Sequence, residues 1–113
     1  MNIWALDKDT SVKHLLLLLA EQFQDGGYKI IDSPSDDKRA IRLINPRATN
    51  AQLYVFIYGQ AEGYYGVHIE YPDLKETNYQ DTIETHENIS FDQLVSIITT
   101  NLEVPVTGRP EIR

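Results

Sequence analysis

The stretch 52–71 constrains the fold most, because two runs of alternating side chains flank a glycine-bounded loop. The runs are QLYVFIY at 52–58 and YYGVHIEY at 64–71, and the loop between them is GQAEG. Alternation with a period of two is typical of β-strands, and a five-residue loop with glycines commonly joins two antiparallel strands. The stretch therefore predicts a β-hairpin.

The side chains also predict the register of this hairpin. The favoured register brings two aliphatic rows onto one face, since a slip of one residue would move them to the other face. It pairs Tyr58 with Tyr64, Phe56 with Gly66, Val55 with Val67, Tyr54 with His68 and Leu53 with Ile69. An aromatic ring can lie over the bare backbone of a cross-strand glycine, so the pairing of Phe56 with Gly66 is itself favourable.

A helix is predicted near each end of the chain. Residues 10–25 carry apolar side chains at helical spacing, and Thr10 is the expected N-cap. Residues 91–102 form the second predicted helix, and they follow Ser90, which makes a capping box with Gln93.

Short strands are predicted between the helices. Besides the hairpin, residues 28–32 and 39–44 have strand composition, and 79–85 alternates weakly, as an edge strand or a loop would. The order is α-β-β-β-β-(β)-α, which predicts an antiparallel meander of four or five strands. Both helices must bury an apolar face, so we expect an α+β two-layer sandwich with both helices on one face of the sheet. The domain is expected to span 1–103, and 104–113 to form an extended tail.

The negative charge is concentrated in one part of the chain. The net charge is −7; residues 1–59 hold seven acidic and seven basic residues, whereas 60–103 hold nine acidic residues and Lys75 alone. A field of this sign repels phosphate backbones and attracts basic surfaces. We therefore expect a basic protein partner and no nucleic acid, with solubility as the alternative explanation of the acidity.

The sheet face opposite the helices is predicted to be aromatic, with Arg42 among its polar neighbours. Tyrosine offers a large contact area with few rotors to freeze, and it is enriched at interfaces. Aromatic residues also pair well across strands, so structural packing is the alternative. The partner-binding candidates are this face and the acidic residues near it: Tyr54, Phe56, Tyr58, Glu62, Tyr64, His68, Glu70, Asp73 and Glu76.

Two leucines of the first predicted helix lie off its apolar stripe. Leu17 and Leu18 point toward His14 and Glu21, on the polar side. Either another element, such as segment 3–6, covers them, or a partner or a second copy of the chain does. They are therefore the candidates for a homodimer contact.

No catalytic, cofactor or metal site is expected. His68 and Glu70 share one strand face, and Glu84 and His86 repeat the spacing in an expected loop, but two ligands do not make a metal site. The serines lie in turns or caps, and the glycines flank a hairpin instead of opening a helix, so neither a nucleophile nor a phosphate loop is predicted.

The expected function is non-enzymatic protein binding, as in an immunity or inhibitor protein that neutralises a basic toxin such as a nuclease. The alternatives are an acidic secretion-type chaperone, a homodimeric structural protein, and a small enzyme or ligand-binding domain with a site at His68 and Glu70. The chain has no cysteine, no apolar run of about 20 residues and no basic N-terminal region. These features predict a cytoplasmic location and no membrane partner.

Overall fold

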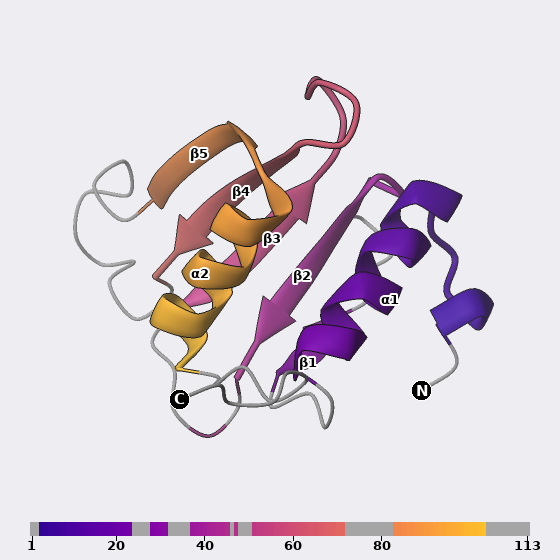
Figure 1. Cartoon of the computed structure of the whole chain (residues 1–113). Helices are drawn as coiled ribbons and strands as arrows, with labels where there is room; N and C mark the ends of the chain where they lie inside the picture. Colours follow the sequence, from indigo (N-terminus) through magenta and orange to yellow (C-terminus); the bar gives the residue numbers. More distant parts are fainter. Residues whose placement is uncertain are drawn as a thin grey trace, which may run out of the picture.

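The computed structural model describes residues 3–23, 28–31, 37–45, 47, 51–71 and 83–103. In chain order they form η1 (Ile3–Ala5), α1 (Thr10–Phe23), β1 (Lys29–Ile31), β2 (Ala40–Ile44), β3 (Gln52–Phe56), β4 (Tyr65–Glu70), β5 (Ile83–Ile89) and α2 (Phe91–Leu102). Each strand pairs antiparallel with its neighbour in sequence, so the sheet order is β1-β2-β3-β4-β5. Figure 1 shows both α-helices on one side of this sheet. The predicted α+β order and two-layer meander are confirmed, and the tail expected at 104–113 lies outside the described residues.

The β3–β4 hairpin has the register that its alternating side chains predict. The ladder pairs Leu53 with Ile69, Tyr54 with His68, Val55 with Val67 and Phe56 with Gly66. The aliphatic rows share the face that the helices cover, which is named the inner face from here on. The fifth predicted pair, Tyr58 with Tyr64, lies beyond the ladder, because β3 ends at Phe56 and β4 begins at Tyr65.

An aliphatic core fills the space between the inner face and the two helices. The predicted helical stripes supply it: Val12, Leu15, Leu16, Leu19 and Phe23 from α1, and Leu94, Ile98 and Leu102 from α2. α2 packs over β3 and β4, whereas α1 covers the half of the sheet that holds β1 and β2 (Figure 1). Each buried leucine or isoleucine contributes about 1.5–3 kcal/mol of transfer free energy, so this core is what joins the two layers.

Both ends of α2 have partners for their backbone groups. The Ser90 hydroxyl accepts from the Gln93 backbone N–H at 3.2 Å, and Gln93 Oε1 accepts from the Ser90 N–H at 2.8 Å. At the other end, the buried side chain of Asn45 donates to the Leu102 carbonyl oxygen at 2.7 Å. The predicted capping box is confirmed, and Asn45 ties the last turn of α2 to the end of β2.

The cap of α1 differs from the prediction. Thr10 is the first helical residue, so it is not the N-cap. Asp9 takes this role: its carboxylate accepts from the Ser11 N–H at 3.2 Å, and its carbonyl oxygen accepts from the Lys13 N–H at 3.1 Å. Hydrogen bonds from the Ser11 hydroxyl and N–H hold the pKa of Asp9 below its ordinary value.

β5 departs furthest from the sequence prediction. An edge strand is present at Ile83–Ile89, where it pairs with β4, and residues 79–82 of the predicted 79–85 lie outside the described residues. Glu84 and His86 therefore lie on a strand, and the prediction of a loop there is wrong. A bulge interrupts the ladder, and Asn88 adopts a left-handed φ of 52°. Backbone pairing with β4 holds this strand in the sheet, and Ile89 at its end is buried in the core.

Candidate functional site

The outer face of the sheet, opposite the helices, carries a closed aromatic cluster. Phe56 lies at its centre, with Ala40 beside it on β2 and Gly66 beside it on β4. Its ring stacks on Tyr58 with centroids 4.9 Å apart, and it meets His68 edge-on at 5.0 Å. These neighbours leave Phe56 only 4% exposed. The ring is as buried as a core residue although both described α-helices lie on the opposite face of the sheet.

Tyr54 extends this cluster toward a charged pair. Its ring centroid lies 5.7 Å from that of His68, and its hydroxyl oxygen lies 3.1 Å from that of Tyr58. The Arg42 guanidinium lies over the Tyr54 ring, 4.7 Å from the centroid. Arg42 Nη1 also donates to Glu70 Oε1 at 2.6 Å. The predicted residues Tyr54, Phe56, Tyr58, His68 and Glu70 are thus brought together, mainly in contact with one another.

Glu70 is held by two donors, since the Gln52 side chain also donates to its Oε1, at 3.0 Å. A metal ion at His68 and Glu70 would share the Glu70 carboxylate with the Arg42 guanidinium, whose positive charge opposes a second cation there. In the part of the chain that the structure describes, no three His, Cys, Asp or Glu side chains gather in a way that could hold a metal. The outer face therefore satisfies its own polar groups, and its geometry is that of a stabilising layer.

The remaining partner-binding candidates do not join this cluster. The prediction that Tyr64 shares the outer face with Tyr58 is wrong. Tyr64 precedes β4, its N–H closes a turn, and its side chain lines a cleft beside α1. Strand alternation does not continue into a turn, which is the reason for the error. Glu62 belongs to the same turn and is exposed, whereas Asp73 and Glu76 lie outside the described residues.

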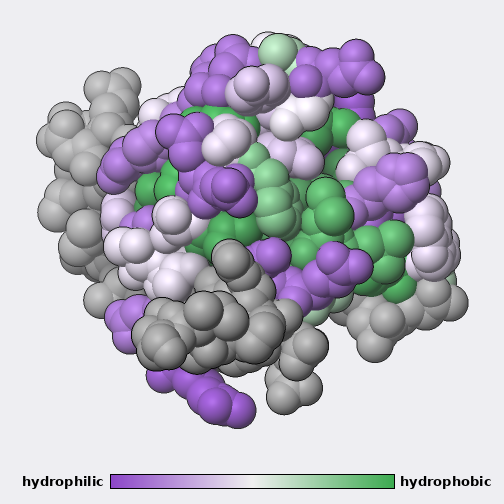
Figure 2. Space-filling model, viewed as in Figure 1, coloured by the Kyte–Doolittle hydropathy of each residue, from purple (hydrophilic) through white to green (hydrophobic). Residues whose placement is uncertain are grey.

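Exposed apolar surface gathers around α1. Among the described residues, four large apolar side chains are exposed: Trp4 at 51%, Leu17 at 37%, Leu18 at 42% and Tyr64 at 46%. Figure 2, viewed from the helix side, shows apolar (green) surface over α1. Together with His14, which contacts Trp4, these four side chains are named the α1 surface.

η1 contributes Trp4 to the α1 surface without burying the two leucines. Lys13 Nζ donates to the Trp4 carbonyl oxygen at 3.0 Å and lies 5.9 Å from the centroid of the indole ring. The indole also meets the His14 ring edge-on, with centroids 5.8 Å apart. These contacts fix η1 against the first half of α1. Leu17 and Leu18 stay exposed, so cover by this segment, one of the two predicted possibilities, is not complete.

A cleft of about 400 Å³ opens between α1 and the loop that joins β3 to β4. α1 lines it with Ser11, His14 and Leu18, and the loop lines it with Glu62 and Tyr64. This volume is at the lower end of the range of ligand pockets, roughly 300–1,000 Å³. The cleft and the α1 surface are continuous, because His14, Leu18 and Tyr64 belong to both.

The loop wall of the cleft is tied to β5. The Asn88 N–H donates to Gln60 Oε1 at 2.6 Å, and the Ala61 N–H donates to Asn88 Oδ1 at 2.7 Å. Within the loop, Gly59 and Gly63 have positive φ angles of 73° and 82°, which suit glycine at the third position of a turn. The protein itself therefore sets the conformation of this wall.

None of the described helices has the length and apolar composition needed to cross a bilayer. No family model matches the chain, and no curated protein or solved structure is significantly similar to it. The function of the chain is therefore inferred from its geometry and its charge.

Trp4, His14 and Asn88 are among the residues of the site that were not sequence-based candidates. A signal exists for Trp4, since it is the single tryptophan of the chain and lies near a helix with surplus leucines. His14 shares a helical face with Leu18, at a spacing of four residues. Asn88 has no such signal, because its role depends on a bulge that the sequence does not reveal.

Proposed function

We propose that this protein is a non-enzymatic, acidic protein-binding domain that engages a basic partner protein through the α1 surface. The observation that carries the proposal is that the exposed apolar side chains of the described residues lie together: Trp4 contacts His14, His14 lines one cleft with Leu18 and Tyr64, and Leu17 is next to Leu18 on α1. Apolar groups that gather at one exposed place mark interaction sites, whereas scattered ones do not. The outer face is the weaker candidate, because Phe56 is buried there and Glu70 is paired.

The charge of the described residues supports a basic partner. From residue 60 onward they include no lysine or arginine, while five of their acidic side chains are exposed: Glu62, Glu84, Glu87, Asp92 and Glu103. Negative potential of this kind speeds the encounter with a cationic surface and disfavours acidic partners. In this proposal the acidic residues steer the partner, and the α1 surface supplies apolar contact that slows dissociation.

The biological role we infer is that of an immunity or inhibitor-type protein. A domain of this size neutralises a basic toxin, such as a nuclease, when it covers the cationic cleft that the toxin uses to hold its substrate. The mechanism requires tight association and no chemistry by the inhibitor itself.

The test is co-expression of the tagged protein with the product of each neighbouring open reading frame, followed by affinity capture. We expect capture of a protein rich in lysine and arginine, weakened as NaCl rises from about 50 to 200 mM because screening acts on exposed charges. Leu18→Glu should abolish capture, since it puts a carboxylate into the apolar contact. Thr100→Glu is the matched control, because it adds the same charge at an exposed position of α2. Undiminished capture by Leu18→Glu, or capture of acidic proteins alone, contradicts the proposal.

A second copy of this chain is the other candidate occupant, and the exposure of Leu17 and Leu18 favours it. Sedimentation velocity over a range of concentrations decides between the two. A dimer that forms in the wild type and is lost in Leu17→Glu would assign the α1 surface to self-association instead of to a basic partner.

A further inference from the structure

We infer that the cleft between α1 and the β3–β4 loop is a preformed socket for one long cationic side chain, arginine or lysine, of the partner. This inference rests on the proposed function and names the chemical group that the partner inserts. Three features of the cleft carry it: an aliphatic lining, a single carboxylate with a tyrosine beside it, and a wall held in place from within the protein.

The aliphatic part of the cleft suits the stem of such a side chain. Leu15 and Leu18 line it from α1, and Ile57 lines it from the end of β3. Arginine and lysine lay their methylene groups along apolar surface and keep the charged head toward water. Because Leu18 is 42% exposed, the stem would cover apolar area that is otherwise in contact with solvent.

The polar part of the cleft suits the cationic head. Among the described residues that line it, Glu62 is the only carboxylate, and none is a lysine or an arginine. Tyr64 lies in the same turn as Glu62, lines the cleft and is exposed, and tyrosine rings attract cations. An apolar side chain in the same place would take Glu62 out of water without giving it a partner, which is unfavourable. Charge complementarity therefore selects a cationic occupant.

Asn88 is the positioning residue of this socket. Glu62 and Tyr64 belong to the turn that starts at Ala61, and the Ala61 N–H is the donor that Asn88 Oδ1 holds at 2.7 Å. The Asn88 N–H returns a hydrogen bond to the loop through Gln60 Oε1 at 2.6 Å. A wall fixed before binding lowers the entropic cost of association, so the socket needs no rearrangement to receive its occupant.

The probe is a blocked peptide with one arginine between glycines, compared with peptides that carry citrulline or norleucine instead. Citrulline keeps the shape of arginine without its charge, and norleucine keeps only an aliphatic stem. Each is titrated into the isotope-labelled full chain and followed by NMR. We expect saturable shifts of the amides at 11–18 and 57–65 with the arginine peptide. The citrulline peptide should bind with an affinity at least roughly fivefold lower, because it lacks the charge-assisted contact.

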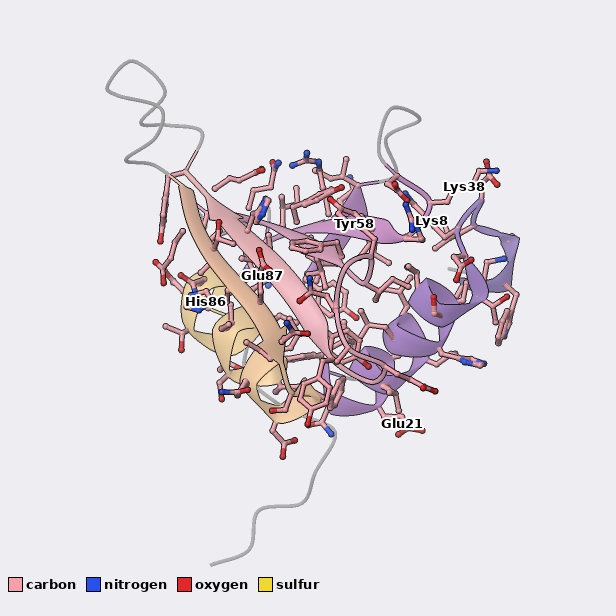
Figure 3. The ribbon with its side chains drawn as sticks, turned by 90° about the horizontal axis from the view of Figure 1, so that it is seen from above. Lys8, Glu21, Lys38, Tyr58, His86 and Glu87 are labelled. Carbon is pink, nitrogen blue, oxygen red and sulfur yellow. The ribbon has the colours of Figure 1, made fainter. Side chains whose placement is uncertain are left out.

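Two pairs of variants locate the binding. Glu62→Gln should lower the affinity for the arginine peptide roughly fivefold. Glu87→Gln, the same change of charge on β5, should alter the affinity less than about twofold, since Glu87 is exposed and does not line the cleft. Figure 3 shows Glu87 and His86 on opposite sides of β5, with Glu87 away from α2. Asn88→Gly keeps a left-handed backbone but removes the acceptor, so it should weaken binding, and Asn88→Asp should restore it.

The outcomes separate this inference from the proposed function. Equal binding of the norleucine and arginine peptides, or equal losses in Glu62→Gln and Glu87→Gln, overturns the cationic socket. Capture of a basic neighbouring protein by wild type and Glu62→Gln alike would also overturn it, while the proposed function stands. Selective arginine binding without any basic protein captured would support the socket and count against the proposed partner.

Discussion

The ring of Phe56 occupies the space that a side chain at Gly66 would need, because a Cβ there would lie 2.3 Å from Cε2 and Cζ of the ring. On the other neighbouring strand the residue opposite Phe56 is Ala40, which is fully buried. Two small residues thus flank one large ring, and this is how the outer face packs an aromatic layer without a helix above it.

Gly66→Ala is expected to lower the free energy of unfolding by about 1–3 kcal/mol, the usual cost of overpacking a filled site. Urea denaturation followed by circular dichroism measures it. The double variant with Phe56→Leu should recover part of the loss, because the smaller side chain vacates the space of the ring. Strictly additive effects in the double variant would show that the two residues do not compete for that space.

Arg42→Met should destabilise the fold by about 1–3 kcal/mol, because it leaves the partly buried Glu70 carboxylate without its cation. The Arg42 and Glu70 side chains are 24% and 23% exposed. Arg39→Met is the matched control: its guanidinium also lies over a tyrosine ring, but its pair with Asp37 is more exposed, at 54% and 37%. That control should cost less, because an exposed ion pair is screened by solvent and contributes little. Equal losses in both variants would contradict the distinction.

Ser90→Ala should lower stability by about 1 kcal/mol, because it removes the hydroxyl that accepts from the Gln93 N–H at the start of α2. Ser96→Ala serves as the control, since Ser96 is exposed in the middle of the same helix. That change should be neutral or slightly stabilising, as alanine favours helix interiors. Thermal unfolding of the two variants side by side measures the difference, and a loss in Ser96→Ala as large as in Ser90→Ala would show that capping is not the cause.

Burial raises the pKa of Tyr28 to about 12, whereas a tyrosine in the unfolded chain ionises near pH 10. The folded state therefore keeps a proton that the unfolded chain has lost, so Tyr28 supports the fold fully below about pH 10 and less as the pH rises toward 12. Tyr28→Phe should flatten this alkaline decline in urea denaturation midpoints measured from about pH 9 upward. If stability declines as steeply in Tyr28→Phe as in the wild type, the alkaline decline is due to other groups, such as Tyr65, whose pKa is also raised by burial.

Much of the fold follows from the sequence, because burial on one face leaves few choices. The hairpin register could be predicted since a one-residue slip would expose both aliphatic rows. The capping box could also be predicted, because Ser90 and Gln93 lie within one helical turn and their hydrogen bonds depend only on local geometry. Local and repetitive patterns of this kind determine their own geometry.

The candidate site was less predictable, because it depends on contacts between elements. β5 has polar side chains on both faces, so its position follows from pairing with β4 and not from its own pattern. The sequence shows that Leu17 and Leu18 lie off the apolar stripe, but their exposure depends on where η1 packs. Tyr64 does not lie on the predicted face because it ends a turn, and a turn interrupts the alternation of the strand. Asn88, from β5, holds this turn through the Ala61 N–H.

The meander has a consequence for the order in which the protein acquires its structure during synthesis. Each strand can pair as soon as its successor leaves the ribosome, since neighbours in the sheet are neighbours in sequence, and contacts between segments close in sequence cost little loop-closure entropy. α2 is different, because it emerges after all five strands yet covers β3 and β4. A nascent chain that has not yet released residues 91–102 therefore presents the inner face of β3 and β4 without α2. How quickly α2 docks sets how long each new molecule is open to aggregation.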